Sequence, residues 1–360
     1  MHQRNVSVIK GGEDDFSVGV GHNLFERIVS LKNLLLAWRE FRRGKRNKPD
    51  VQQFEFSLED NLFKIHQELL IGAYKNDPYV SFYVTDPKLR HIHKASVRDR
   101  VIHQAVFRVL YPIFDASFIF DSYSCRLDKG THRAVVRLEI FLRKMSRNFQ
   151  QSVWALKLDI RKFFDAVDHD ILLGLIRKKI SDQKILCLIE GIVRSFTVGT
   201  GRGLPLGNVT SQLFSNIYLN ALDQFVKHQL LVKYYLRYCD DYVIVADRRE
   251  YLERLIPRFA EFLGQALKLE LHKKKIIIRK YSQGVDFLGY VILPYYIVLR
   301  TKTKRRMLKR LLINRALLNN EKVNQVNFNQ SVQSYFGVLS HCRGYKLIRL
   351  IKSVFSFLYL

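Results

Sequence analysis

Two adjacent aspartates, Asp240 and Asp241, interrupt the apolar run LRYCDDYVIVA at residues 236–246. Successive side chains of a strand point to opposite faces, so alternation alone cannot place both carboxylates in solvent. Burying an unpaired carboxylate is costly. The run therefore predicts either a tight hairpin turn at the two aspartates or a cation that neutralises them.

A third aspartate, Asp159, ends the half-buried strand that alternation predicts at residues 153–159, VWALKLD. If this strand lies beside the run 236–246, three carboxylates converge, and they repel one another unless divalent cations bind. Oxygen ligands beside a phosphate favour Mg²⁺, with Mn²⁺ as a substitute. Two such ions about 3.5–4 Å apart would activate a 3′-hydroxyl and stabilise a leaving pyrophosphate. The alternative is a plain Asp-Asp turn without metal.

The elements that position these aspartates follow from periodicity. Apolar residues recur at a helical spacing through NLFERIVSLKNLLLAWREFRRGKR, and a second helix is expected to begin at Ser57, an N-cap with Asp60 three residues later. Residues 79–95 alternate and predict a two-stranded hairpin around Asp86-Pro87. Further elements expected in chain order are a helix from 97 to 111, a helix in HDILLGLIRKKI, a Gly/Pro loop at 199–207, a helix at 211–230, a helix at 250–267, short strands within 268–299 and basic helices from 302.

Composition narrows the class of protein. The 360 residues contain 60 Lys and Arg against 33 Asp and Glu, a net charge of +27. This excess predicts a polyanionic partner, nucleic acid rather than membrane, and no apolar run reaches the roughly 18 residues of a membrane span. The four cysteines form no CxxC pair and the N-terminus has no signal-peptide core, so a reducing, cytoplasmic setting is expected.

Five motifs in order resemble the palm of reverse transcriptases. They are LKLDIRKFFDAVDH, GLPLGNVTSQLFSN, YCDD, LELHKKK and DFLGY, within a resemblance that runs from about residue 23 to 350. The resemblance implies an α+β right-hand polymerase fold with fingers, a palm of antiparallel sheet plus helices, and a short helical thumb. The expected division is a loose N-terminal arm at 1–22, N-terminal helices and fingers at 23–152, the palm at 153–300 and the thumb at 301–360.

The same resemblance implies roles for individual residues. The catalytic metal ligands are Asp159, the Ile160 carbonyl, Asp240 and Asp241. The expected nucleotide-binding residues are Arg90, Arg98, Arg100, Phe164, Gln212 and Lys275. The expected template and primer contacts are Leu204, Gly207, Phe287, Leu288, Gly289, Lys304, Arg305 and Arg306.

Each role has a physical basis and an alternative. The Phe164 ring would strike a ribose 2′-hydroxyl and so favour deoxynucleotides, the alternative being a core phenylalanine. Arginines would bind triphosphate oxygens, but Arg98 and Arg100 could instead form an internal brace with Asp99. Lys275 could protonate the leaving pyrophosphate, with its lysine neighbours as rivals. Gln212 would touch the nucleotide or template, or serve only as a polar residue at a helix start.

The finer motif pattern is similar to the reverse transcriptases of diversity-generating retroelements. It combines Leu206-Gly207 and Ser211-Gln212 with DSYSCRLDKGTHRA, RDRVIHQA and SQGVDFLGYVI. Such relatives copy a template RNA into cDNA from dNTPs, form a cDNA/RNA hybrid, misincorporate at adenines during mutagenic retrohoming, and work with a small basic accessory protein and structured non-coding RNA. Leu204 and Arg90 are expected near the template base, where an apolar residue 204 would loosen base-pair geometry. The alternatives are a group II intron-like or phage-defence reverse transcriptase and, as a non-enzyme, an RNA-binding remnant.

Overall fold

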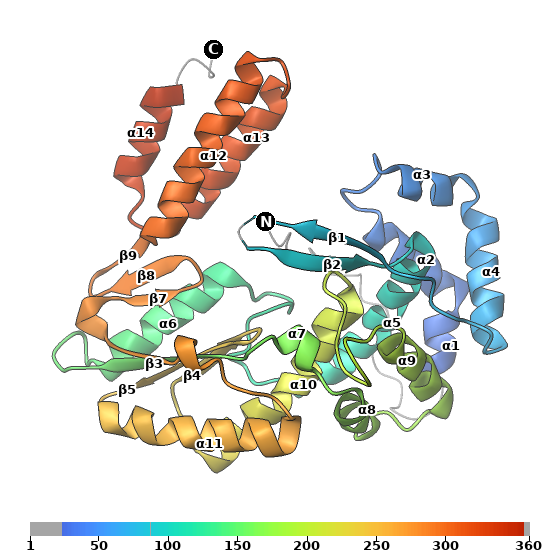
Figure 1. Cartoon of the computed structure of the whole chain (residues 1–360), viewed down its shortest axis with the longest axis horizontal. Coiled ribbons are helices and arrows are strands. Elements are labelled where there is room, and N and C mark those ends of the chain that lie inside the picture. The colour runs from blue at the N-terminus through green and yellow to red at the C-terminus, as the bar shows by residue number, and fades with distance from the viewer. Residues whose placement is uncertain (1–23, 87, 356–360) are drawn as a thin grey trace.

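The computed structural model describes residues 24–86 and 88–355, so the predicted arm at 1–22 and Pro87 of the predicted turn lie outside the described residues. An antiparallel four-stranded sheet with the strand order β4-β5-β3-β6 lies between α6 and α11, at the lower left of Figure 1. Its strands are β3 (Trp154–Asp159), β4 (Tyr235–Tyr238), β5 (Asp241–Ala246) and β6 (Ile277–Lys280). The two strands predicted around the aspartates are therefore confirmed as neighbours.

Three long helices cover the sheet: α6 (Thr131–Met145), α10 (Val209–Gln224) and α11 (Arg249–Leu267). Alternation along the strands separates two apolar layers. Leu156 and Ile244 join the main core on the side of α10 and α11, whereas Ala155 and Val243 pack on the opposite side with α6. Because β3 and β5 are buried on both faces, they read as nearly continuous apolar runs, and a charged residue within them has a position fixed by register.

The N-terminal part is a helical layer packed around one buried helix. The elements are α1 (Leu24–Val29), α2 (Leu31–Phe41), α3 (Pro49–Phe56), α4 (Leu58–Leu70) and α5 (Val97–Asp115). The prediction of one unbroken first helix was wrong, because the Ser30 side chain accepts a hydrogen bond from the Asn33 N–H and starts α2. Ser57 does precede α4, but its side chain makes no capping hydrogen bond.

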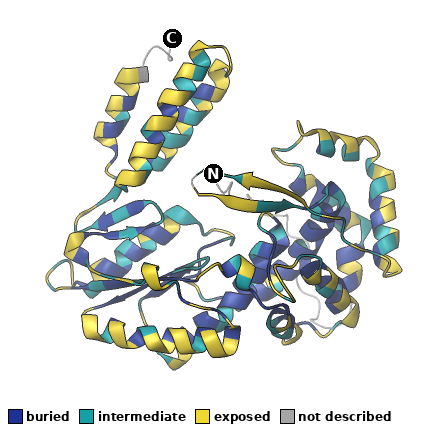
Figure 2. Ribbon diagram, in the orientation of Figure 1, coloured by how far each residue is buried: buried dark blue, intermediate teal, exposed yellow. Residues whose placement is uncertain are grey.

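A two-stranded hairpin, β1 (Val80–Val84) and β2 (Arg90–Lys94), projects from this layer (Figure 1). Its residues are largely exposed (Figure 2). One backbone hydrogen bond, from the His93 N–H to the Leu206 carbonyl at 3.3 Å, joins the hairpin to the loop before α10. The predicted hairpin is thereby confirmed, and it lies next to the Gly/Pro loop.

Shorter elements complete the centre of the molecule. They are α7 (Phe163–Ala166), α8 (His169–Arg177), α9 (Gln183–Arg194), the π-helical turn η1 (Phe225–Gln229) and the 3₁₀ turns η2 (Lys273–Lys275) and η3 (Tyr281–Gln283). The turn η1 continues α10, so the helix predicted at 211–230 changes its hydrogen-bond pattern near its end.

The C-terminal part begins with a three-stranded antiparallel sheet, β7 (Val285–Phe287), β8 (Tyr290–Leu293) and β9 (Tyr296–Leu299). Three helices follow: α12 (Thr301–Asn319), α13 (Gln325–Leu339) and α14 (Tyr345–Phe355). They have a small core of their own around Met307, Leu311 and Phe328 and otherwise expose much of their surface (Figure 2). The Arg310 side chain of α12 bonds Asp86 at the tip of the β1–β2 hairpin, so the C-terminal helices contact the hairpin directly.

No helix within the described ranges combines the length and the apolar character needed to cross a bilayer.

Candidate active site

The three predicted aspartates lie together at one end of the central sheet. Asp159 is paired in register with Asp241 across β3 and β5, and Asp240 lies in the two-residue turn between β4 and β5. The preceding residue of this turn, Cys239, has a φ of 54°, as such tight hairpins require. The tight turn is thus confirmed, and its aspartates also lie near Asp159, whereas the cation stays a prediction.

Lys275 is the lysine that reaches the carboxylates. Its Nζ donates to Oδ1 and Oδ2 of Asp159 at 2.7 Å each, whereas the neighbouring Lys273 and Lys274 are exposed. The position of η2 is set by the backbone, since the His272 N–H donates to the Asp159 carbonyl at 2.8 Å. Of the three lysines, Lys275 is therefore the one that lies at the carboxylates, and its role as proton donor stays a prediction.

Burial and mutual repulsion raise the proton affinity of Asp240 and Asp241. Burial, followed by the charge of Asp159, raises the pKa of Asp240. Burial, followed by the charge of Asp240, raises the pKa of Asp241 to about 6. A partly buried set of carboxylates that resist ionisation is stabilised by a hard divalent cation, and this donor set fits Mg²⁺.

The Ile160 carbonyl also fits the expected ligand set. Ile160 forms an isolated antiparallel bridge with Leu271, and the flanking hydrogen bonds use the Arg161 N–H and the Asp159 carbonyl. Ile160 and Leu271 are thus a non-hydrogen-bonded pair, in which each carbonyl points away from the other residue. The Ile160 carbonyl therefore points toward the side of β5. Across residues 24–86 and 88–355, however, no three His, Cys, Asp or Glu side chains are gathered as a ready metal cage. Lys275 bonds Asp159 in this arrangement, so metal binding requires a rearrangement at Asp159.

A buried ion pair beneath the Asp-Asp turn was missed by the sequence analysis. Arg237 and Asp223 are both fully buried, and Arg237 Nη2 lies 2.7 Å from Asp223 Oδ2. The Tyr235 hydroxyl also donates to Asp223, and Arg237 Nη1 donates to the Asn216 side-chain oxygen at 3.0 Å and to the Cys239 carbonyl at 3.3 Å. Arg237 thus connects the Asp-Asp turn to α10. The position of Arg237 inside an apolar strand was the sequence signal from which a buried ion pair could have been predicted.

Lys157 was also missed. It precedes Asp159 by two residues and therefore lies on the same face of β3. Its Nζ is 4.0 Å from Asp286 Oδ1, and Asp286 also bonds Arg300, the residue before α12. Burial lowers the pKa of Lys157, whereas the charge of Asp241 opposes this shift. A chain of alternating charges therefore joins the carboxylate cluster to the base of α12.

The Gly/Pro loop places Phe164 at the edge of the site. Phe164 is half-buried and packs edge-on against the fully buried Phe163, so Phe163 is the core member of the pair and the gate role of Phe164 stays a prediction. The Leu204 N–H donates to the Phe164 carbonyl at 2.7 Å. The Leu204 side chain itself is only 3% exposed and belongs to the main core, so the expected contact between this side chain and a template base was wrong. Gly207 has a φ of 115°, and a Cβ there would lie 3.4 Å from Ile92 of the hairpin.

The three predicted finger arginines separate into two groups. Arg98 bonds Glu68 and lies 3.3 Å from Asp99, and Arg100 Nη2 lies 2.9 Å from Asp50. The predicted brace with Asp99 is therefore present for Arg98 but not for Arg100, and their binding to a nucleotide stays a prediction, which would require both to leave these acidic partners. Arg90 is exposed at the start of β2. Gln212 lies half-exposed in the first turn of α10, as predicted.

The predicted template and primer residues also differ in accessibility. Phe287 is fully buried, so the expected contact through this side chain was wrong. Leu288 and Gly289 form the two-residue turn between β7 and β8, with φ values of 48° and 92°. The three basic residues predicted to contact the hybrid, Lys304, Arg305 and Arg306, are exposed in the first turns of α12.

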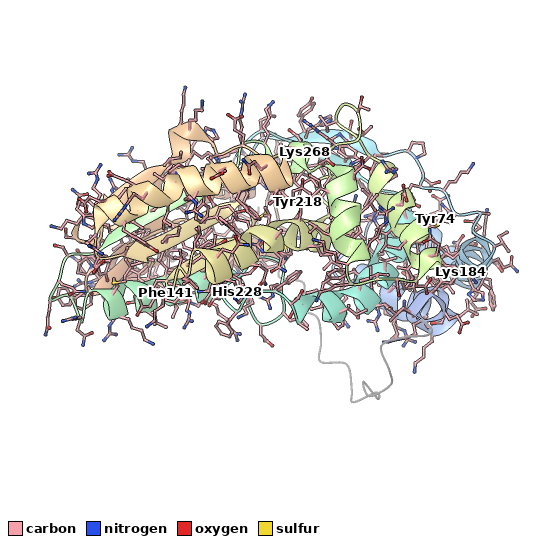
Figure 3. All side chains as sticks on the ribbon, turned by 90° about the horizontal axis from the view of Figure 1, so that it is seen from below. Tyr74, Phe141, Lys184, Tyr218, His228 and Lys268 are labelled. Carbon is pink, nitrogen blue, oxygen red and sulfur yellow. The ribbon has the colours of Figure 1, made fainter. Side chains whose placement is uncertain are left out.

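A second polar cluster holds the segment that follows Phe164. The Tyr218 hydroxyl on α10 donates to the Leu267 carbonyl at 2.6 Å, and the Asp168 N–H donates to the same hydroxyl. Lys268, at the end of α11, places its Nζ 2.7 Å from Asp168 Oδ2. Figure 3 shows Tyr218 and Lys268 on these two neighbouring helices. The cluster ties α8, α10 and α11 together behind the site.

Carboxylates on adjacent antiparallel strands, helices on both sheet faces, a projecting hairpin and a basic helical unit define the right-hand polymerase fold. Residues 76–292 match the family model described as Reverse transcriptase (RNA-dependent DNA polymerase). The chain belongs to this family. A solved structure of apo telomerase from Candida tropicalis has the same fold, with a TM-score of 0.53 and 11% identity over 79% of this chain and 59% of that chain.

Two curated relatives are similar in sequence. Protein YkfC of Escherichia coli is 26% identical over 269 residues, covering 64% of this chain and 70% of that protein. The group II intron-encoded protein LtrA of Lactococcus lactis subsp. cremoris is 27% identical over 305 residues, covering 65% of this chain and 50% of that protein. The chain thus spans about half the length of the intron-encoded relative.

Proposed function

We propose that the protein is an RNA-directed DNA polymerase that copies an RNA template into cDNA from dNTPs. The observation that carries this proposal is the convergence of Asp159, Asp240 and Asp241, with Lys275 bonded to Asp159. The net charge of +27 and the exposed lysines and arginines of α12 suit a nucleic-acid duplex, whose backbone is recognised electrostatically. Membership of the reverse transcriptase family agrees with both features.

Asp159, Asp240, Asp241 and the Ile160 carbonyl would hold two Mg²⁺ ions, for which Mn²⁺ can substitute. When bound, such ions activate the primer hydroxyl and offset charge on the leaving pyrophosphate. The Lys275 ammonium lies at Asp159, beside the proposed metal site, and from there can donate a proton to the leaving pyrophosphate.

The remaining site residues select and hold the substrate in this proposal. The Phe164 ring excludes the ribose 2′-hydroxyl, and the Leu204 N–H holds the Phe164 backbone in place. Arg90 and Gln212 contact the incoming nucleotide. The turn at Leu288 and Gly289 contacts the primer, and Lys304, Arg305 and Arg306 contact the cDNA/RNA hybrid. Gly207 permits close approach of the template strand.

We further propose that the cDNA synthesis is error-prone and serves a diversity-generating retroelement, with a small basic accessory protein and a structured RNA as partners. The motif form GNVTSQ and the sequence DSYSCRLDKGTHRA support this assignment. The similarity to a group II intron-encoded protein favours a second candidate, an intron-like reverse transcriptase that makes cDNA for another purpose.

Primer extension on an RNA template with dNTPs and Mg²⁺ tests the activity. The wild-type chain should extend the primer, and Asp240→Ala/Asp241→Ala should not. Extension that survives in the double variant would refute the catalytic assignment. Sequencing the cDNA then separates the two candidates, because a retroelement of the first kind yields errors concentrated opposite template adenines, and an even error spectrum favours the second.

A further inference from the structure

One face of the β1–β2 hairpin carries a row of contacting rings. The ring centroids of Tyr83 and His91 lie 4.4 Å apart with an interplanar angle of 7°. His91 and His93 follow at 4.2 Å, and His93 and Phe196 at 4.5 Å, in tilted contacts. Register explains the row, because Tyr83 is directly opposite His91 on the antiparallel partner strand.

The outer pair of this row is open to solvent. Tyr83 is 64% exposed, His91 is exposed, and His93 and Phe196 are half-buried behind them. Since only one face of the Tyr83 ring rests on His91, the other face is accessible. A flat ring that is already supported loses little conformational freedom when a second flat ring stacks on it.

The inner end of the row lies beside the candidate active site. The His93 N–H bonds the Leu206 carbonyl, and a Cβ at Gly203 would lie 3.4 Å from the Phe196 ring. The charge of Asp165, the residue after Phe164, also acts on the His93 imidazole. The row therefore starts at the Gly/Pro loop and extends outward toward the tip of the hairpin.

The charge around the row suits an anionic ligand. Residues 80–94 contain one acidic residue, Asp86, and its carboxylate is already engaged by Arg310. Lys88 is exposed at the same end of the hairpin, and so is Arg90, although strand alternation places Arg90 on the opposite face. Aromatic rings next to basic side chains are the combination that binds single-stranded nucleic acid, because any base can stack and the phosphates add a salt-dependent attraction.

We propose that the Tyr83–His91 pair is a stacking platform for an unpaired nucleobase, which receives the single-stranded template before it reaches the active site. This proposal rests on the polymerase function and adds a specific template-binding site to it. The opposite face of the hairpin, where Ile92 lies against Gly207, is separate from the platform because neighbouring strand residues point to opposite faces.

Binding of a short single-stranded RNA that carries a fluorescent purine analogue tests the platform without catalysis. Tyr83→Ala and His91→Ala should each weaken binding roughly tenfold and reduce quenching of the analogue. Tyr83→Phe keeps the ring and should behave as the wild type. The matched control is Phe82→Ala, which removes a 45% exposed ring from the opposite face of the same strand and should leave binding unchanged.

Wild-type affinity and quenching in Tyr83→Ala would overturn the proposal and leave the surface to another class of partner, such as a protein. An equal loss in Phe82→Ala would also overturn it, because the effect would then belong to the hairpin as a whole.

Primer extension separates this proposal from the proposed function. With a template that extends far beyond the primer, Tyr83→Ala should raise the KM for the primer–template roughly tenfold at unchanged kcat. With a template that offers a single unpaired base, the same KM should not change. A wild-type chain that extends neither template would refute the polymerase function, whereas the RNA-binding measurement would still decide the platform. A KM that rises equally on both templates would contradict the platform.

Discussion

Replacing Asp241 by asparagine should make the protein more stable while it abolishes activity. The folded state raises the pKa of Asp241 from 3.8 to about 6, because the carboxylate is buried and faces Asp240. A carboxyl whose pKa is raised by folding destabilises the folded state when it is ionised. The asparagine side chain carries no charge at any pH, so the variant avoids this destabilisation.

The size of the effect follows from the shift of about two pKa units. Each unit corresponds to about 1.4 kcal/mol, so the ionised carboxylate costs about 3 kcal/mol above pH 7. At pH 5 the folded-state carboxyl is mostly protonated while the unfolded-state carboxyl is mostly ionised, and the difference falls to about 1.5 kcal/mol. The advantage of the variant should therefore grow as the pH rises from 5 to 7 and then level off.

Urea denaturation of both chains from pH 5 to 8, with a chelator present, measures this difference. Asp247→Asn is the matched control, because Asp247 is exposed just after the same strand and its replacement should change the free energy of unfolding by less than about 0.5 kcal/mol. An Asp241→Asn variant that is no more stable than the wild type at pH 8, or whose advantage does not depend on pH, would refute the electrostatic reasoning.

Two further predictions concern the groups around the carboxylates. Lys275→Ala should lower the single-turnover rate of nucleotide addition about 100-fold, because a general acid is removed. The control variant Lys274→Ala should keep the wild-type rate. Equal rates in the two variants would exclude a special role for Lys275. Asp223→Asn should lower the free energy of unfolding in urea by about 3–5 kcal/mol, because Arg237 would stay buried without its counter-charge, and a loss below about 1 kcal/mol would show that the pair does not hold the turn.

The sequence predicted the placement of the aspartates better than the ion pairs that surround them. Asp159 and Asp241 could be brought together because both lie in short, apolar, alternating strands, whose neighbours are limited. Alternation of side chains along a strand places Lys157 on the face of Asp159, and the apolar neighbours of Arg237 indicate that it is buried. Their partners, Asp286 and Asp223, belong to other elements, so local sequence patterns do not reveal them.

Side-chain direction was the other limit of prediction from the sequence. The motif containing Phe287 was assigned to primer binding, yet its ring points into the core while the next two residues form the exposed turn. Arg98 could bind either a triphosphate or an acidic side chain, and the choice depends on Glu68, which lies 30 residues earlier on another helix. A motif locates a segment but does not determine which of its side chains faces the substrate.

The contact between Arg310 and Asp86 has a consequence for how nucleic acid enters and leaves. It joins the last helical unit to the tip of the hairpin, so in the proposed polymerase the polypeptide would enclose a strand held between the hairpin and α12. Both side chains are about half exposed, and such an ion pair contributes only about 0–1 kcal/mol. This contact therefore breaks at thermal energies and breaks more easily as ionic strength rises, which would allow a strand to load sideways yet hinder its escape once the phosphates are also held.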